Sequence, residues 1–153
     1  MSLRARFSDA LKEAMKARRE REVSALRMML AGLKNRDIAA REKGVADGIP
    51  DAEIAQMLQG MIKQRRESIE LYKKGGRDEL AQQEREEIAV IEGFLPKQLD
   101  AAGAEAAIKA AIAETGAASV KDMGKVMAAL KAKHAGQMDF GAAGPVAKRL
   151  LGD

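Results

Sequence analysis

Apolar residues recur every three or four positions through most of this sequence, which is the spacing of one face of an α-helix. Four such sets, at residues 3–15, 23–38, 54–72 and 80–95, predict four successive helices. Glycine and proline interrupt the pattern between the second, third and fourth sets. Aromatic residues make up only 3% of the chain, whereas strong helix formers dominate it. The sequence therefore predicts an all-α fold.

The segment Gly93-Phe94-Leu95-Pro96 changes the character of the chain, because proline disfavours helix at the residue before it and has no backbone N–H to donate. We place a domain boundary here. Residues 1–93 are expected to form an N-terminal bundle or hairpin of long helices, and residues 94–153 a small C-terminal domain of three helices.

Capping residues mark the helices of the C-terminal part. Asp100 is a suitable N-cap and Gly116 a suitable terminator for one helix. Asp139 is a suitable N-cap for the last helix. We expect that helix to begin later than Phe140, because Pro145 forfeits a hydrogen bond unless it lies in the first turn.

The sequence lacks the residues of common catalytic sites. The chain has no cysteine, so disulfides, thiolate metal sites and a cysteine nucleophile are excluded. Its only histidine, His134, excludes sites that need two histidines. Glu84 and Glu87 stand three residues apart and could hold a hydrated divalent ion, but carboxylates interleaved with Arg85 are typical of a solvated helix face. We expect no catalytic residue, no metal and no cofactor.

The first residues do not predict a signal peptide, because Asp9 and Glu13 follow soon after an amphipathic start. Nowhere do about eighteen apolar residues run together, as a membrane span requires. We therefore expect a cytoplasmic protein that does not associate with membranes.

Positive charge gathers in the C-terminal part, although the net charge of the whole chain is only +4. Ser119 and Asp122 resemble a capping box at the start of a helix. Lys121 and Lys125 would then lie on one face beside the positive end of that helix, which suits a phosphate. Residues 119–136 contain a single acid against these basic side chains: Lys121, Lys125, Lys131, Lys133 and His134.

Several short motifs resemble those of the YqeY family, also called GatB/YqeY. They are Ser2-Leu3 with its following amphipathic helix, residues 94–99, residues 121–127 and residues 136–139, where Gln137 replaces the usual lysine or arginine. The residues that carry the C-terminal resemblance are Leu95, Pro96, Gln98, Asp122, Met123, Gly124, Lys125, Val126, Met127, Gly136 and Asp139. The resemblance covers essentially the full chain.

The C-terminal domain of this family is similar to the tail domain of the B subunit of glutamyl/aspartyl-tRNA amidotransferase. The resemblance therefore implies a tRNA-associated helical module. A glutamine-dependent carbon–nitrogen ligase activity would need partners that supply an ATP site, a metal site and an amidase. Within the lysine-rich motif, Gly124 either admits another backbone or serves helix packing, and the apolar residues Met123, Val126 and Met127 are expected in the core.

Three hypotheses follow. The first is a module that binds tRNA or another structured RNA through the five basic residues of 119–136, by phosphate contacts because aromatic residues are scarce. The second is an adaptor that docks a synthetase or an amidotransferase subunit. The third is an amide-forming enzyme in its own right, for which the sequence shows no site, or an accessory part of a glutamine-dependent carbon–nitrogen ligase. The adaptor would use two groups of N-terminal cations, namely Arg18, Arg19, Arg21 and Arg27, or Lys63, Arg65 and Arg66.

Overall fold

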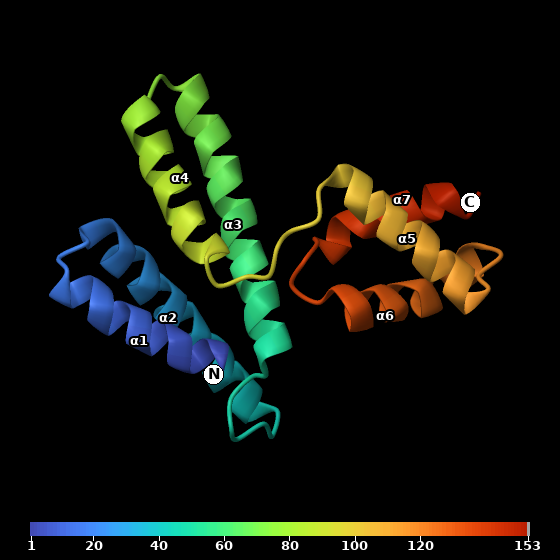
Figure 1. Ribbon diagram of the computed structural model, residues 1–153, viewed down its shortest axis with the longest axis horizontal. Helices are drawn as coiled ribbons and strands as arrows, with labels where there is room; N and C mark the ends of the chain where they lie inside the picture. Colours follow the sequence, from blue (N-terminus) through green and yellow to red (C-terminus); the bar gives the residue numbers. More distant parts are fainter. Residues whose placement is uncertain (153) are drawn as a thin grey trace. The chain divides into compact units, whose positions relative to one another are not determined.

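The computed structural model describes residues 1–152, and within them it is all-helical, with seven α-helices, one 3-10 helix and no strand (Figure 1). The all-α prediction is confirmed. The chain divides into two compact units, Met1–Leu95 and Pro96–Asp153. The elements are α1 (Leu3–Lys16), α2 (Glu20–Glu42), α3 (Asp51–Lys74), α4 (Asp78–Glu92), α5 (Ala101–Thr115), η1 (Val120–Asp122), α6 (Met123–His134) and α7 (Phe140–Leu150).

The N-terminal unit consists of two helical hairpins, α1 with α2 and α3 with α4 (Figure 1). The hairpins share one apolar core, because α2 also packs against α4 and α3. Burial of each large side chain in this core contributes about 1.5–3 kcal/mol relative to exposure. The large side chains that are less than 2% exposed here are Phe7, Leu26, Met29, Ile54, Leu58 and Ile91.

The end of α4 differs slightly from the sequence-based expectation. The helix stops at Glu92, with Gly93 as its C-cap, so residues 94 and 95 lie beyond it. Phe94 and Leu95 nevertheless pack against the N-terminal core. The Phe94 ring meets the Phe7 ring edge-on with 5.1 Å between centroids, and the guanidinium of Arg6 lies 5.2 Å from the Phe94 centroid. These contacts fasten the end of the unit to its first helix.

An ion pair secures the loop between α2 and α3. Arg4 donates to both carboxylate oxygens of Asp37, at 2.5 and 3.1 Å, and also to the carbonyl of Ile49 at 3.1 Å. Asp37 in turn accepts the backbone N–H of Ile49 at 2.9 Å. The hydrogen bond from Arg4 is the main cause that holds the pKa of Asp37 below its ordinary value. Glycine is needed at position 48, where φ is +88°, because a Cβ atom there would lie only 2.6 Å from Nη2 of Arg4 and would clash with the guanidinium of this ion pair.

The C-terminal unit packs α5, α6 and α7 around a second core with smaller side chains. Asp100 caps α5 by accepting the N–H of Gly103 at 2.7 Å, and Gly116 ends it at φ +66°, as predicted. The buried members of this core are Ile108, Ala111, Val126, Leu130, Met138, Ala143 and Ala147.

The start of α7 corrects the sequence analysis. The helix begins at Phe140, and Pro145 lies inside it rather than in its first turn. Asp139 caps this helix as predicted, since its side chain accepts the N–H groups of Gly141 and Ala142 at 2.9 and 3.4 Å. The lost proline hydrogen bond is tolerated because this cap and the burial of Ala143 and Ala147 hold the helix in place.

Within residues 1–152, no helix combines the length and the apolar character needed to cross a bilayer.

Candidate nucleic-acid interface

A capping box opens the lysine-rich segment. Ser119 accepts the N–H of Lys121 at 3.3 Å, and Asp122 accepts the N–H groups of Ala118 and Ser119 at 3.0 and 3.4 Å. The two backbone N–H groups, first that of Ala118, lower the pKa of Asp122, and nearby Lys125 adds to this. The predicted capping box is therefore confirmed.

The box changes the geometry that we expected for the two lysines. It tightens the first turn into the 3-10 helix η1, which holds Lys121, and α6 begins only at Met123. Lys121 and Lys125 thus do not lie on one continuous α-helix. Both side chains are exposed, and neither forms an ion pair with any residue of 1–152.

The outer side of α6 is formed by small residues. Gly124, Ala128 and Ala132 follow each other at four-residue spacing, and all three are exposed. A Cβ built at Gly124 would find no atom within 4 Å, so this glycine does not serve packing against another helix of the described chain. By helix geometry the exposed side chains of Lys125 and Lys131 flank this line of small residues on its two sides.

The inner side of α6 belongs to the C-terminal core. Val126 and Leu130 are buried, and the partly buried Met123 and Met127 pack against them. The interpretation of these apolar motif residues as core is confirmed. They orient α6 so that its lysines point outward.

Two of the five predicted basic residues are engaged within the unit. Lys133 forms an ion pair with Glu114 of α5. The Nδ1 atom of His134 lies 2.9 Å from Oε1 of Gln137, and the ring is partly buried. The structure therefore leaves three of the five side chains, those of Lys121, Lys125 and Lys131, both exposed and unpaired within residues 1–152.

The remaining motif residues hold the start of the unit against the turn after α6. The Nε2 atom of Gln98 donates to the carbonyls of Pro96 and Gly136, and the N–H of Leu99 donates to the carbonyl of Gln137 at 2.9 Å. Gly136 is buried and adopts φ +77°, which a side chain would strain. The side chain of Gln137 lies 3.5 Å from the carbonyl of Lys97. Sequence reasoning missed this bracing, because it joins residues 38 to 40 positions apart.

Every carboxylate of residues 96–152 either accepts a backbone hydrogen bond or forms an ion pair. Asp100, Asp122 and Asp139 accept backbone N–H groups at helix starts. Glu105 pairs with Lys109 and Arg149 at 3.8 and 3.5 Å, and Glu114 pairs with Lys133. The positive charge that remains without an ion pair in this part of the chain belongs to Lys97, Lys121, Lys125, Lys131 and Lys148.

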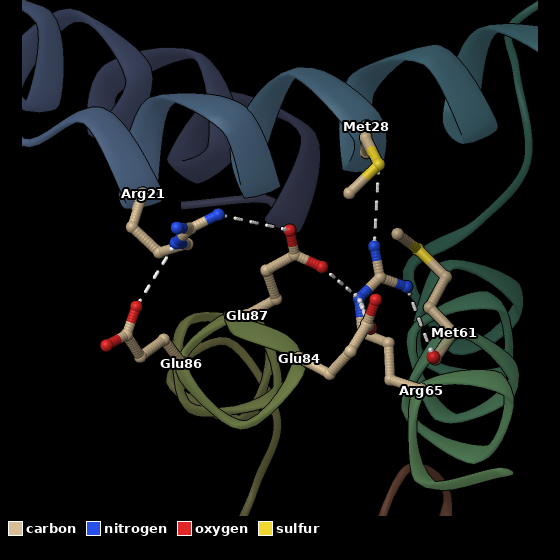
Figure 2. A network of polar contacts seen from close by, with 7 residues as sticks. All are labelled: Arg21, Met28, Met61, Arg65, Glu84, Glu86 and Glu87. Carbon is tan, nitrogen blue, oxygen red and sulfur yellow. Dashed lines mark hydrogen bonds and ion pairs between the residues drawn. The ribbon is translucent and has the colours of Figure 1, made fainter. Parts of the chain in front are cut away.

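A buried ion pair lies in the N-terminal unit, where Arg65 of α3 faces Glu87 of α4 (Figure 2). The Nε–Oε2 distance is 2.9 Å, and each residue is 8% exposed. Arg65 also donates to the carbonyl of Met61 at 3.2 Å and approaches the sulfur of Met28 at 3.6 Å. The ion pair therefore joins α3 to α4, and the approach of Arg65 to Met28 adds a contact with α2.

Further charges surround this pair. Glu84 lies 3.9 Å from Arg65, and Arg21 reaches Glu86 at 3.1 Å and Glu87 at 4.0 Å (Figure 2). Desolvation, followed by repulsion from Glu87, raises the pKa of Glu84. The interpretation of these carboxylates as a solvated helix face is wrong for Glu87, because α4 turns that side toward α2 and α3. Within residues 1–152, no three or more His, Asp or Glu side chains gather where they could hold a metal ion.

These observations define an all-helical protein whose C-terminal unit presents unpaired lysines around an open helix surface. The family model "Yqey-like protein" matches residues 4–151. The chain belongs to this family, and the resemblance seen in the motifs is confirmed.

The chain is also similar to curated fungal proteins named "Altered inheritance of mitochondria protein 41, mitochondrial". It is 31% identical to that of Eremothecium gossypii over 106 residues, which cover 69% of this chain and 56% of the relative. It is 33% identical to that of Candida glabrata over 95 residues, which cover 62% and 50%. The chain thus spans about half the length of these relatives.

This comparison overturns the expected cytoplasmic location, because the relatives are mitochondrial by name. The expectation failed for a physical reason. A cysteine-free chain without a long apolar run suits any aqueous compartment of the cell, so these features do not distinguish the cytoplasm from a mitochondrial compartment.

Proposed function

We propose that the C-terminal unit binds the phosphates of tRNA or another structured RNA through Lys121, Lys125 and Lys131. One observation carries this proposal: all five carboxylates of residues 96–152 are occupied, while these three lysines are exposed without an ion pair. Cations that lack internal partners are free to replace the counterions of a nucleic acid.

The surface between the lysines favours a phosphate backbone as the ligand. Gly124, Ala128 and Ala132 project no long side chain, so a nucleic-acid strand can approach α6 closely. The aromatic residue of the unit, Phe140, is partly buried against the core and does not offer a platform for stacked bases. Recognition would therefore depend on backbone charge and shape.

The similarity of the family's C-terminal domain to the amidotransferase tail supports tRNA as the RNA to test first. We further propose that residues 94–153 act as a domain of their own, joined to an N-terminal long-helix domain that has a separate task. The placement of Phe94 and Leu95 against the N-terminal core moves the practical cut for such a domain to Pro96.

The adaptor hypothesis has less support. Of the arginines assigned to it, Arg65 is buried and Arg19, Arg21 and Arg66 pair with carboxylates. An accessory role in a glutamine-dependent carbon–nitrogen ligase rests on the family resemblance alone and stays a prediction.

A salt titration with bulk tRNA tests the proposal. In a variant with Lys121→Gln, Lys125→Gln and Lys131→Gln, three phosphate contacts are lost. The slope of log K against log salt, which is negative, should then become about 2–3 units less steep. The matched control neutralises three cations that are already paired, with Lys109→Gln, Lys133→Gln and Arg149→Gln. Equal slopes for the two variants, or the absence of salt-dependent tRNA binding by the natural chain, would refute the assigned site.

A further inference from the structure

A second set of exposed cations lies on α2 of the N-terminal unit. Arg27, Lys34 and Arg41 follow each other at seven-residue spacing within this single helix, and all three are exposed. Seven residues make almost two full turns, so the three side chains lie along one edge of α2. Their Cα atoms extend over about 21 Å of helix axis at about 1.5 Å per residue. We call these three residues the α2 cation row.

One acid, Asp37, lies beside the row, three residues after Lys34 and four before Arg41. None of the three cations forms an ion pair with a residue of 1–152. Arg4 forms an ion pair with Asp37 at 2.5 Å, and Arg41 acts on this carboxylate only as a nearby charge. The two acids of α2 that form no ion pair within residues 1–152 lie at its ends, Glu20 at the start and Glu42, next to Arg41, at the end.

The residues beside the row favour a nucleic-acid strand over a protein partner. Three residues before each cation stand Ser24, Ala31 and Ile38, which lie next to the row on the helix surface. Among them only Ile38 is a large apolar side chain, and it is 45% exposed. A stable protein interface needs an apolar centre with aromatic or other large anchors, whereas a phosphate backbone needs only regularly spaced cations.

We propose that the α2 cation row binds the sugar–phosphate backbone of a structured RNA, as a second contact surface in addition to the lysines around α6. The ligand class of this inference rests on the proposed function, but its residues lie in the other unit. The row extends over about 21 Å, so its three cations can contact phosphates at separate points along one backbone. Contacts on two linked units make the second binding event intramolecular and raise the overall affinity.

The test compares two isocharge variants of the full chain in tRNA titrations between low and moderate salt. The row variant carries Arg27→Gln, Lys34→Gln and Arg41→Gln. The control carries Lys12→Gln, Lys63→Gln and Arg77→Gln, which removes three exposed, unpaired cations that belong to α1, to α3 and to the start of α4. Glutamine has nearly the helix propensity of lysine and arginine, so circular dichroism should show both variants folded.

We expect the row variant to lose about 2–3 units of salt slope and to bind tRNA at least tenfold more weakly at low salt, while the control changes less than twofold. Restoring charge with Arg27→Lys and Arg41→Lys on an otherwise natural chain should keep the natural slope.

If the row variant and its control bind alike, the inference is wrong. A row variant that remains unaffected while the α6 variant loses binding leaves the proposed function standing. The reverse pattern removes the α6 site and keeps the row. Binding of polyglutamate, but not tRNA, to the row would point to an acidic protein and overturn the inference.

Discussion

The cores of the two units contain side chains of different size and polarity. The N-terminal core buries large side chains from four helices and encloses the Arg65–Glu87 ion pair. The C-terminal core has three alanines among its seven buried members, and the carboxylates around it serve helix starts and surface pairs. The larger core stabilises its unit by packing, so charges can be enclosed there. In the smaller unit local caps contribute more, and the lysines stay outside.

The sharpest test of this difference removes one buried leucine from each unit. Leu130→Ala and Leu58→Ala should each cost about 3–4 kcal/mol. We expect the smaller C-terminal unit to unfold in the first variant while the amides of the N-terminal unit keep their exchange protection. Unfolding followed in urea by two-dimensional NMR checks this. A single common transition in both variants would show that the two units are not independent.

The buried ion pair allows a comparison of two neighbouring carboxylates. Glu87→Gln leaves the buried Arg65 charge without its partner and should cost about 3 kcal/mol. Glu84→Gln should instead be neutral or slightly stabilising. The reason is that the pKa of Glu84 is raised in the folded protein, which means that folding disfavours its ionised form. The contribution of Glu84 to the free energy of unfolding therefore falls as pH rises through the folded pKa. Equal losses from the two changes would contradict the assigned roles.

The Arg4–Asp37 pair should make the N-terminal unit sensitive to acid. The pKa of Asp37 is lowered in the folded protein. The contribution of this carboxylate to the free energy of unfolding is therefore present above its ordinary pKa of 3.8 and is lost as pH falls through the folded pKa. Asp37→Asn should cost about 1.5 kcal/mol at neutral pH. Urea midpoints of the natural chain and this variant should converge below pH 3.8; a constant difference down to low pH would exclude this role.

The smallest expected effect concerns the turn between α1 and α2, where Arg18 adopts φ +56°. A side chain in this left-handed conformation costs about 1 kcal/mol, so Arg18→Gly should stabilise the N-terminal unit by about that amount. Ala17→Gly is the matched control, because φ −83° at that position already suits any residue. Thermal unfolding should separate the two variants in opposite directions.

Much of the local structure could be predicted from the sequence. The periodic apolar residues placed the helices, and the caps at Asp100, Ser119 and Asp139 formed as expected. The site could be predicted only in part. Lys133 and His134 looked equivalent to the other basic residues, but they have partners on α5 and in the turn after α6. Hydrophobic periodicity says which side of a helix is buried, and it does not identify the element that covers it.

By itself, then, the sequence determined what depends on residues close together along the chain. The cap bonds at Asp100 and Asp139 link positions two or three apart, and such short bonds form wherever a helix begins. Only the tertiary structure decided which charges are buried, paired or left exposed. Arg65 and Glu87 are 22 residues apart and Lys133 and Glu114 are 19 apart, so these pairs exist only because packing brings separate helices together.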